Sequence, residues 1–365
     1  MSKQNILFVS KKFLLQPFGG REMLSSLNYK LLRNIFNQNC FHFEISSNQS
    51  HSNKLKLFSK IFQGEIDGVS EEVLAKLSLQ VRLQNISQIF VDGSNLGLVA
   101  QNLKKEFPNI KIFTFFHNVE TKFFYDSLAR AKSLRSIIIL VANYFAERKS
   151  VKYSDHLICL TKTDSNILSN LFNRNADSIL PMALADKLDG HASSINEKAE
   201  EKYVLFVGGL FYANEHGVRW FVRHIAPNIS YKILIVGRGF EVFKNEFEKT
   251  KNITVVGEVD DLNKWYRESD CVIAPIFEGS GMKTKVAEAL MFGKKIVASS
   301  AALDGYEGIP NNICYSCNSK AAFIETLNSL FSEQHLKFDQ RIRDIYENNF
   351  SFSAAEKNLK KILFS

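Results

Sequence analysis

Short apolar runs alternate with stretches of helical periodicity along the first half of the chain. The first run, NILFVS at 5–10, precedes a loop that reaches Gly19 and Gly20, and apolar positions then recur at helical spacing from Arg21 to Ile35. Four further runs are typical of buried strands: CFHFEIS (40–46), QIFVDGS (88–94), IKIFTFFHN (110–118) and HLICLTKT (156–163). Because strands that alternate with helices form parallel sheets covered on both faces, residues 1–185 predict one α/β domain.

The same pattern starts again in the second half. Between Pro181 and Glu201 the sequence becomes polar and loses its periodicity, which indicates a linker at 186–201. The strand-like runs that follow are KYVLFVGGL (202–210), YKILIVGRG (231–239), NITVVGEV (252–259) and DCVIAPIF (270–277), and the chain reads as helical after Lys320. We therefore predict two Rossmann-like α/β domains, 1–185 and 202–345, with ligands bound in the cleft between them.

The segment 277–299, FEGSGMKTKVAEALMFGKKIVAS, carries the strongest chemical signal. A glycine-rich loop leads from a strand into a helix, where backbone N–H groups and the helix dipole favour a phosphate. Gly281, Lys285 and Glu288 share one flank of that helix because they are three and four residues apart. The alternative is an ordinary surface helix whose Lys and Glu are solvated.

The wider context resembles a known family. Gly293 ends the helix and a buried strand, IVAS, follows at once. This strand, loop, helix and strand unit resembles the donor-binding segment of retaining, nucleotide-sugar-dependent glycosyltransferases of the two-Rossmann GT-B class, the glycosyl transferases group 1 family. The resemblance implies two domains that face each other across a cleft, and a C-terminal segment, 346–365, whose helix from about Ser353 to Leu363 crosses back onto the first domain.

The resemblance also implies donor-binding residues. FVGGLFYANEHGVRWF (206–221), IVGRG (235–239) and GEVDDL (257–262) match three further family segments in order and spacing. Many relatives hold the diphosphate with an Arg and a Lys in the first of these, and this chain has neither, so phosphate binding is expected to rely on backbone amides, Lys285 and Arg238. The donor site implied is Gly208, Gly209, Asn214, Gly237, Arg238, Val259, Glu278, Ser280, Gly281 and Met282.

Glu288 corresponds to the second of two family glutamates, which hydrogen-bonds the ribose hydroxyls of the donor. A carboxylate suits this role because it accepts from both hydroxyls of a diol. The alternative is a solvated glutamate paired with Thr284 or Lys285. The first family glutamate falls at Ser280 in this chain, and Glu278, two residues earlier, is the candidate replacement.

In the first half, FFHNVE places His117 at the end of a predicted strand. Relatives carry a histidine here that touches the donor sugar or its phosphate, although a lone histidine is more often structural. We therefore predict His117, Lys285 and Glu288 as the catalytic residues, with Gly19, Gly20, Asn118 and Thr163 in the loops on the acceptor side. Glu147 and Arg148 are interpreted as structural.

Composition and short motifs indicate the cellular location, the state of the cysteines and whether a metal ion is bound. The 365 residues contain no apolar run as long as a membrane-spanning helix, the longest being Ile137 to Ala142, and the N-terminus lacks a signal-peptide layout, so we expect a cytoplasmic protein. Five scattered cysteines indicate reduced thiols, and Cys314 and Cys317 are interpreted as accidental spacing. No Asp-x-Asp motif occurs, so no metal ion is expected.

Basic charge is concentrated in the first half. Residues 1–200 contain 25 Lys and Arg against 18 Asp and Glu, whereas the remainder contains 21 against 20. The excess lies in KLKLFSKIF (54–62) and in 122–152, where basic and aromatic residues mix as they do at anionic membrane surfaces. We expect reversible contact with the inner face of the cytoplasmic membrane; solvated helix faces are the alternative, and no nucleic-acid module is recognisable.

The resemblance implies transfer of a sugar from a nucleoside-diphosphate sugar, UDP being the expected nucleotide, to a saccharide or lipid-linked saccharide with retention of configuration. Bacterial surface polysaccharides such as capsule or lipopolysaccharide are the expected products. Two alternatives stay open. One is a nucleotide-sugar 2-epimerase, which shares the two-Rossmann build, and the other is a catalytically silent partner subunit of a glycosyltransferase complex.

Overall fold

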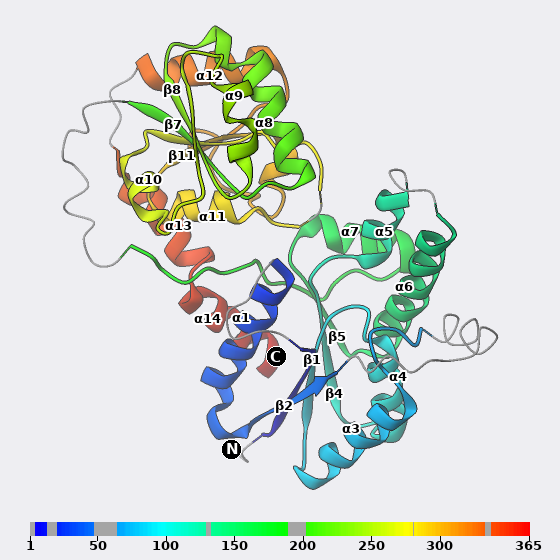
Figure 1. Cartoon of the computed structure of the whole chain (residues 1–365). Coiled ribbons are helices and arrows are strands. Elements are labelled where there is room, and N and C mark those ends of the chain that lie inside the picture. The colour runs from blue at the N-terminus through cyan, green and yellow to red at the C-terminus, as the bar shows by residue number, and fades with distance from the viewer. Residues whose placement is uncertain are drawn as a thin grey trace. The chain divides into compact units, whose positions relative to one another are not determined.

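A computed structural model describes residues 4–12, 20–46, 64–128, 133–188, 202–279, 281–332 and 337–365. The chain forms two compact units, each built on its own parallel sheet (Figure 1). Unit 1 comprises Met1–Met182 and Glu356–Ser365, and unit 2 comprises Ala183–Ala355. Most of the predicted linker, residues 189–201, and all of KLKLFSKIF lie outside the described residues.

The sheet of unit 1 has six strands in the order β2-β1-β3-β4-β5-β6, and all neighbours pair in parallel. This order contains the flavodoxin-like arrangement 2-1-3-4-5, whose direction of winding reverses between the first and third strands. The strands are β1 (Ile6–Lys11), β2 (Cys40–Ile45), β3 (Gln88–Asp92), β4 (Lys111–Phe116), β5 (His156–Cys159) and β6 (Ser178–Ile179).

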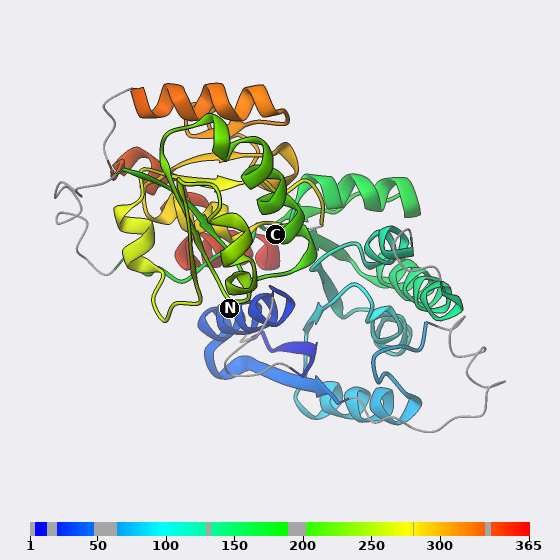
Figure 2. The ribbon, with the colours of Figure 1, turned by 45° about the horizontal axis from the view of Figure 1, so that its top comes forward.

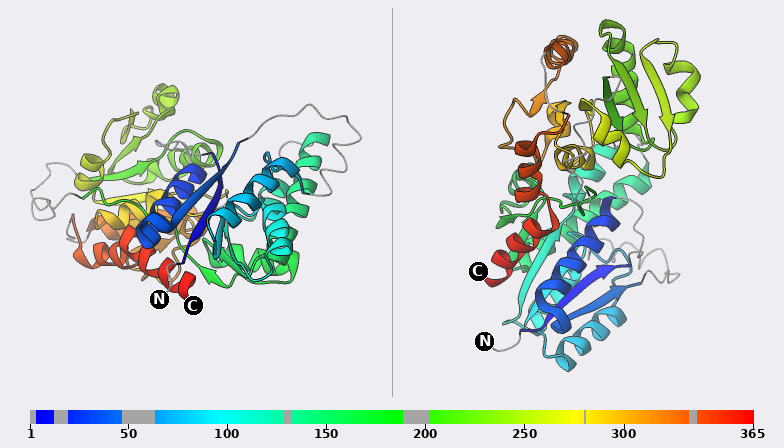
Figure 3. Two further views of the ribbon diagram at one scale, coloured as in Figure 1. Left: turned by 90° about the horizontal axis from the view of Figure 1, so that it is seen from below. Right: turned by 90° about the vertical axis from the view of Figure 1, so that its left-hand side faces the viewer.

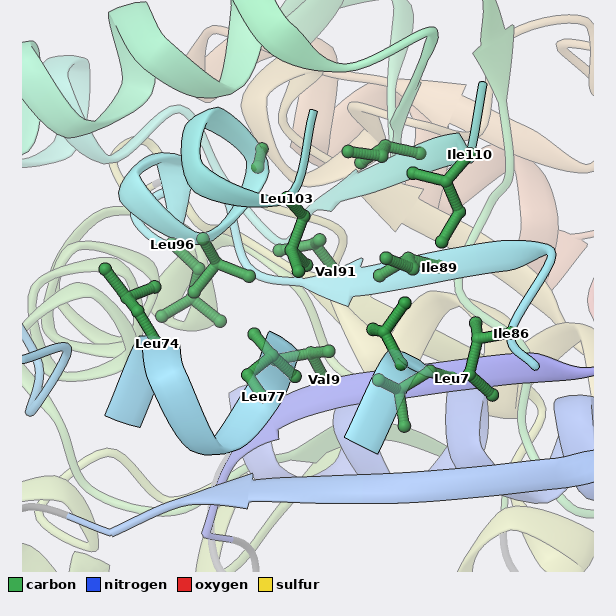
Figure 4. Close-up of a cluster of buried hydrophobic side chains, with 14 of the residues drawn as sticks. Leu7, Val9, Leu74, Leu77, Ile86, Ile89, Val91, Leu96, Leu103 and Ile110 are labelled. Carbon is green, nitrogen blue, oxygen red and sulfur yellow. The ribbon is translucent and has the colours of Figure 1, made fainter. Parts of the chain in front are cut away.

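Helices cover this sheet and enclose an aliphatic core. Figure 4 shows the part of the core in which Leu74 and Leu77 of α3 and Leu103 of α4 meet Val9 and Ile89 of the sheet. β3 is buried along its whole length, as expected of a central strand in a parallel sheet. The helices are α1 (Gly20–Phe36), the 3₁₀ turn η1 (Asn37–Asn39), α3 (Glu71–Leu83), α4 (Gly97–Glu106), α5 (Glu120–Leu128), α6 (Leu134–Tyr153) and α7 (Lys162–Phe172).

The end of the chain packs on unit 1. The last helix, α14 (Phe352–Phe364), begins in unit 2, and its residues from Glu356 onward belong to unit 1. There it lies beside α1, as the right-hand view of Figure 3 shows, and the rings of Phe36 and Phe364 are 5.6 Å apart. Gln88 at the start of β3 also donates to the carbonyl of Leu363.

Unit 2 has the strand order β12-β11-β10-β7-β8-β9, all parallel. Numbered from its own first strand, this is the Rossmann order 3-2-1-4-5-6, in which the winding reverses between β7 and β10. The strands are β7 (Tyr203–Val207), β8 (Lys232–Val236), β9 (Ile253–Gly257), β10 (Cys271–Ala274), β11 (Lys295–Ala298) and β12 (Cys314–Ser316).

The helices of unit 2 include α12, the orange helix at the top of Figure 2. Its α-helices are α8 (Tyr212–His224), α9 (Lys244–Phe247), α10 (Asn263–Glu268), α11 (Thr284–Met291), α12 (Lys320–Ser332) and α13 (Gln340–Asn349), with 3₁₀ turns η3 (Ala226–Asn228), η4 (Phe240–Phe243) and η5 (Ser300–Leu303). Ser299 begins the last of these turns with its own side chain, which accepts from the backbone N–H of Ala302.

The predicted fold class, two Rossmann-like α/β domains, is confirmed by these two sheets. The predicted helix from Arg21 to Ile35 is α1 with one more residue at each end, and the predicted helical character after Lys320 is also confirmed. One strand is shorter than predicted: HLICLTKT ends as β5 at Cys159, because the Thr161 side chain accepts from Asp164 N and starts α7. Thr163 is therefore an exposed residue in the first turn of a helix.

Within the described residues, no helix is long and apolar enough to cross a membrane. The five cysteines are free, in agreement with the predicted reduced thiols, and all five are buried.

Candidate active site

The candidate donor site of unit 2 begins where the loops after β7 and β8 meet. Leu210 N donates to the Arg238 carbonyl oxygen at 2.8 Å, and Gly208 N donates to Val236 O at 3.0 Å. A Cβ atom on Gly237 would lie 2.0 Å from the Gly208 carbonyl oxygen, so the two loops approach too closely for any side chain. In an open α/β sheet, the carboxyl ends of strands at the reversal point are where ligands bind.

The side chain of Lys285, in the first turn of α11, points toward the glycine loop that follows β7. Its Nζ donates to Asn214 Oδ1 at 2.8 Å and lies 4.1 Å from the centre of the Phe206 ring, and Asn214 in turn donates to the Gly209 carbonyl oxygen at 2.7 Å. A Cβ on Gly208 would come within 2.9 Å of this Nζ. The glycine therefore makes room for the ammonium group.

Lys285 is 6% exposed, and its hydrogen-bond acceptor is a neutral amide. Burial lowers its pKa to about 7, although the carboxylate of Glu288 opposes the shift. A buried cation in this state is stabilised by any anion that binds next to it. The arrangement therefore favours a negatively charged ligand.

The side chain of Lys283 hydrogen-bonds to the backbone of the loop between β10 and α11. Lys283 Nζ donates to the carbonyl oxygens of Gly279 and Gly281 at 3.1 and 2.6 Å, and Tyr306 Oη donates to the carbonyl oxygen of Lys283 at 2.8 Å. Gly279 and Gly281 have φ values of +98° and +73°, which favour glycine. Met282 lies half-buried in this loop, and Ser280 lies outside the described residues.

Glu288 lies one turn further along α11 and is 9% exposed. Its Oε2 accepts from Tyr266 Oη at 2.9 Å, and its Oε1 accepts from Lys187 Nζ at 3.0 Å. Glu288 is thus neither solvated nor paired with Thr284. Tyr266 is buried in α10, and its ring stacks on Phe292 with centroids 5.1 Å apart.

Arg238 and Glu278, two further charged residues of the predicted donor site, each pair with another side chain near the surface. Arg238 donates from Nε to Glu258 Oε1 at 2.7 Å, just before the half-buried Val259, and Glu278 lies 2.6 Å from His216 Nδ1. Both pairs are substantially exposed, so they are weak and exchangeable.

The carboxyl edge of the unit 1 sheet holds a different network. His117, directly after β4, is 4% exposed, and its Nε2 lies 2.9 Å from Asp92 Oδ1 at the end of β3. The same carboxylate accepts from Ser25 Oγ at 2.5 Å and from Asn28 Nδ2 at 2.8 Å. Burial opposes ionisation, but the charge of His117 and these hydrogen bonds hold the pKa of Asp92 below its ordinary value. His117 Nδ1 is buried and has no hydrogen-bond partner within the described residues.

Other charged groups gather around the end of β1. Burial, together with the charge of Arg21, lowers the pKa of Lys11 to about 7, while Glu120 opposes the shift. Burial raises the pKa of Glu120, which Arg21, His117 and Lys11 counteract. Lys11 also forms an ion pair with Asp67.

The predicted acceptor-side residues flank this edge. Gly20 is the first residue of α1, Asn118 follows His117 and accepts at its carbonyl from Ser94 Oγ at 3.4 Å, and Thr163 is exposed on α7. Gly19 lies outside the described residues. Glu147 has the structural role interpreted from the sequence, since it accepts from the backbone N–H groups of Glu120 and Thr121 at the start of α5.

The structure thus brings together Gly208, Gly209, Asn214, Gly237 and Lys285 in unit 2, with Glu288 one turn along α11. Sequence reasoning missed the partners of the predicted residues. Asp92 carried a usable signal, because an acid that directly follows the apolar residues of a strand, here Ile89 to Val91, lies at the ligand-binding edge. Tyr266, Phe206 and Lys187 carried none, because their roles depend on contacts between distant segments.

The chain is similar to known glycosyltransferases in sequence. Residues 201–333 match the family described as Glycosyl transferases group 1. An uncharacterized glycosyltransferase of Methanocaldococcus jannaschii is 24% identical, over 75% of this chain and 72% of that protein. The O-antigen biosynthesis glycosyltransferase WbnH of Escherichia coli is 22% identical, over 71% of this chain and 72% of that protein.

Solved structures extend the likeness to the whole fold. Anabaena HepE in complex with UDP superposes with a TM-score of 0.69 at 12% identity, covering 99% of both chains. The apo form of the lipopolysaccharide outer core galactosyltransferase WaaB superposes with a TM-score of 0.68 at 15% identity, also covering 99% of both chains. The two sheets and these likenesses show that the chain has the GT-B fold, and residues 201–333 match the glycosyl transferases group 1 family.

Proposed function

We propose that this protein transfers a sugar from a nucleoside-diphosphate sugar, with UDP as the nucleotide, to a saccharide or lipid-linked saccharide acceptor in the synthesis of a bacterial surface polysaccharide. The observation that carries the proposal is Lys285, a buried cation whose hydrogen bond goes to a neutral amide at the glycine-lined reversal point of a Rossmann sheet. Support for the nucleotide and product class comes from HepE, solved with UDP, and from the O-antigen and lipopolysaccharide enzymes among its relatives.

Each part of the site has a chemical task in this proposal. Lys285, the amides of the loop around Gly281 and Met282, and the dipole of α11 stabilise the diphosphate as negative charge develops on it. Glu288 accepts from the ribose hydroxyls. The acceptor oxygen bonds to the anomeric carbon on the face from which the bond to the diphosphate breaks, and the departing phosphate takes the acceptor proton, so transfer proceeds with retention. Protein groups stabilise the charge of the diphosphate, so no metal ion is expected.

Direct incubation with nucleotide sugars tests the proposal against its alternatives. The protein is mixed with UDP-, GDP- and ADP-linked sugars, with and without lipid-linked saccharide acceptors, and products are resolved by mass spectrometry and NMR. We expect an acceptor-dependent glycoside from a UDP-sugar, with the anomeric configuration of the donor. Formation of a 2-epimer without acceptor would identify an epimerase, and no turnover with any of these nucleotide sugars would favour a silent partner subunit.

A second proposal concerns the membrane and rests on α5 and α6 of unit 1. The longest apolar run of the chain lies in α6, yet Leu134 and Ile137 are 75% and 48% exposed. Phe123 and Tyr125 of α5 are also exposed. Arg135 of α6 is an exposed basic side chain, and the exposed Lys122 of α5 is paired with Asp126. An apolar and basic surface of this kind suits reversible docking on an anionic membrane, where lipid-linked acceptors reside.

Co-sedimentation with vesicles tests docking. The protein should pellet with anionic vesicles at low salt and be released at roughly 0.5 M salt, because the Debye length falls to about 3 Å at 1 M. Leu134→Glu with Ile137→Glu should abolish pelleting, whereas Leu79→Glu with Leu83→Glu, two exposed leucines of α3, should preserve it. Equal recovery with neutral and anionic vesicles would assign the basic surface to solvation alone.

A further inference from the structure

The two oxygens of the Glu288 carboxylate lie in different environments. Oε2 accepts from Tyr266, whose side chain is 1% exposed, and Oε1 accepts from Lys187, whose side chain is 44% exposed. A bond to a buried, packed hydroxyl is fixed, whereas a half-exposed lysine exchanges its partner at little cost. One oxygen is therefore anchored and the other is exchangeable.

Tyr266 is built to serve as the anchor. Its ring lies parallel to Phe292, with an interplanar angle of 3°, so the hydroxyl has little freedom to turn away. Its hydroxyl donates to Glu288. Burial and the neighbouring carboxylate raise the pKa of Tyr266 well above its ordinary value, so the hydroxyl keeps its proton and remains a donor at any physiological pH.

The segment that carries Lys187 is held on the same unit by other contacts. Lys187 N lies 3.3 Å from Met291 Sδ, and Arg343 connects Asp186 to the carbonyl oxygen of Met291 at the end of α11. Tyr346 Oη donates to the carbonyl oxygen of Leu184 at 2.9 Å. The backbone of this segment therefore keeps its place when the Lys187 side chain leaves the carboxylate.

We propose that Tyr266 is a positioning residue for nucleotide recognition: it fixes Oε2 of Glu288 so that Oε1 exchanges Lys187 for a ribose hydroxyl of the donor. The inference rests on the proposed binding of a nucleoside diphosphate by unit 2. Tyr266 on α10 and Glu288 on α11 together give the site its selectivity for a ribose diol. A free carboxylate rotates, whereas an anchored carboxylate presents a single acceptor geometry.

Calorimetry with UDP and 2′,3′-dideoxy-UDP tests the assignment on the full chain. The wild-type protein should bind UDP at least about tenfold more tightly, which is the effect of roughly one charge-assisted hydrogen bond. Tyr266→Phe keeps the ring stack and should reduce this preference to within about threefold, while its affinity for 2′,3′-dideoxy-UDP stays the same. Tyr203→Phe is the matched control, because the Tyr203 hydroxyl donates to the Trp265 carbonyl oxygen next to Tyr266 without touching Glu288, and it should keep the full preference.

The outcomes separate the possible failures. A Tyr266→Phe protein that retains the UDP preference, or that loses affinity for both ligands equally, would overturn the positioning role, the second result indicating a scaffold residue. Wild-type protein that binds neither ligand would instead contradict the proposed function. Tyr266→Phe leaves the buried Glu288 carboxylate without its donor, and if this prevents folding, the comparison is made in the Glu288→Gln background, where that charge is removed. Adding Tyr266→Phe there should cause no further loss of UDP affinity, and a further tenfold loss would also overturn the assignment.

Discussion

The two sheets of this protein place buried polar groups of opposite sign at their reversal points. In unit 2 the group is the ammonium of Lys285, which donates to the neutral amide of Asn214. In unit 1 it is the carboxylate of Asp92, which accepts from Ser25, Asn28 and His117 at once. One site is short of negative charge, and the other already satisfies its own charge within the unit.

This difference in charge predicts different functions for the carboxyl edges of the two sheets. A buried cation without a carboxylate partner gains most when an anion arrives, so unit 2 is suited to holding a diphosphate. The carboxylate of unit 1 already accepts three hydrogen bonds, so it has little to gain from a ligand, but it fixes the ring of His117 at that edge of the sheet. We therefore expect unit 2 to govern nucleotide affinity and unit 1 to govern turnover.

Replacing His117 should give the largest effect. We predict that His117→Ala lowers kcat on the order of 10²–10³, the range for loss of one preorganised group at a reacting centre, and changes UDP affinity little. Steady-state kinetics and calorimetry on the same preparation measure both quantities. His156→Ala is the control, because His156 lies at the opposite, amino edge of the same sheet, 2.8 Å from Ser178 Oγ. A His117→Ala enzyme with full activity would make the histidine purely structural and remove the proposed division of work.

Replacing Lys285 should give the next largest effect, and on binding. Lys285→Ala should weaken UDP by roughly 1.5–3 kcal/mol, the range for hydrogen bonds to charged groups, and Glu288→Gln should weaken it with little loss of fold. Lys294→Met is the matched control: Lys294 is equally buried, but its Nζ donates to the carbonyl oxygens of Arg267, Ser269 and Lys337, so its loss should lower the melting temperature and leave affinity intact. Unchanged UDP, GDP and ADP affinities in the Lys285 and Glu288 variants would rule out this donor site.

The pKa of Lys285 predicts a pH dependence of smaller size. Because the free site has a pKa of about 7 and a bound diphosphate favours the ammonium, binding takes up a proton above pH 7. UDP affinity should therefore fall between pH 7 and 9, by at most tenfold per pH unit, where the charge of a phosphate with a pKa of about 6 no longer changes. In Lys285→Ala this slope should disappear; the same slope in the variant would assign the proton to another group.

Much of the fold and part of the candidate site are predictable from the sequence alone. Periodicity predicted both sheets and most strand positions, because buried parallel strands are apolar along their whole length. Gly208, Asn214 and Lys285 were predicted because they stand in ordered segments that resemble the family. Their energetic setting was not predictable, since Phe206 beneath Lys285 and Tyr266 beside Glu288 come from other strands and helices. In unit 1, His117 was recognised but Asp92 was not, because their hydrogen bond joins two separate strand ends.

Replacing Lys187 should give the smallest effect on UDP affinity, because its ion pair with Glu288 is a weak contact of the candidate donor site. Its ion pair with Glu288 is half-exposed, and pairs of this kind are worth about 0–1 kcal/mol. If the ribose hydroxyl replaces Lys187 on Oε1, Lys187→Met removes a competitor and should strengthen UDP binding by up to about fivefold, with no change in melting temperature beyond about one degree. Lys76→Met, which breaks the exposed pair with Glu72 on α3 of unit 1, is the control and should leave affinity unchanged. Weaker binding in Lys187→Met would mean that the lysine itself contacts the nucleotide, and unit 2 would then hold a second cation for the diphosphate.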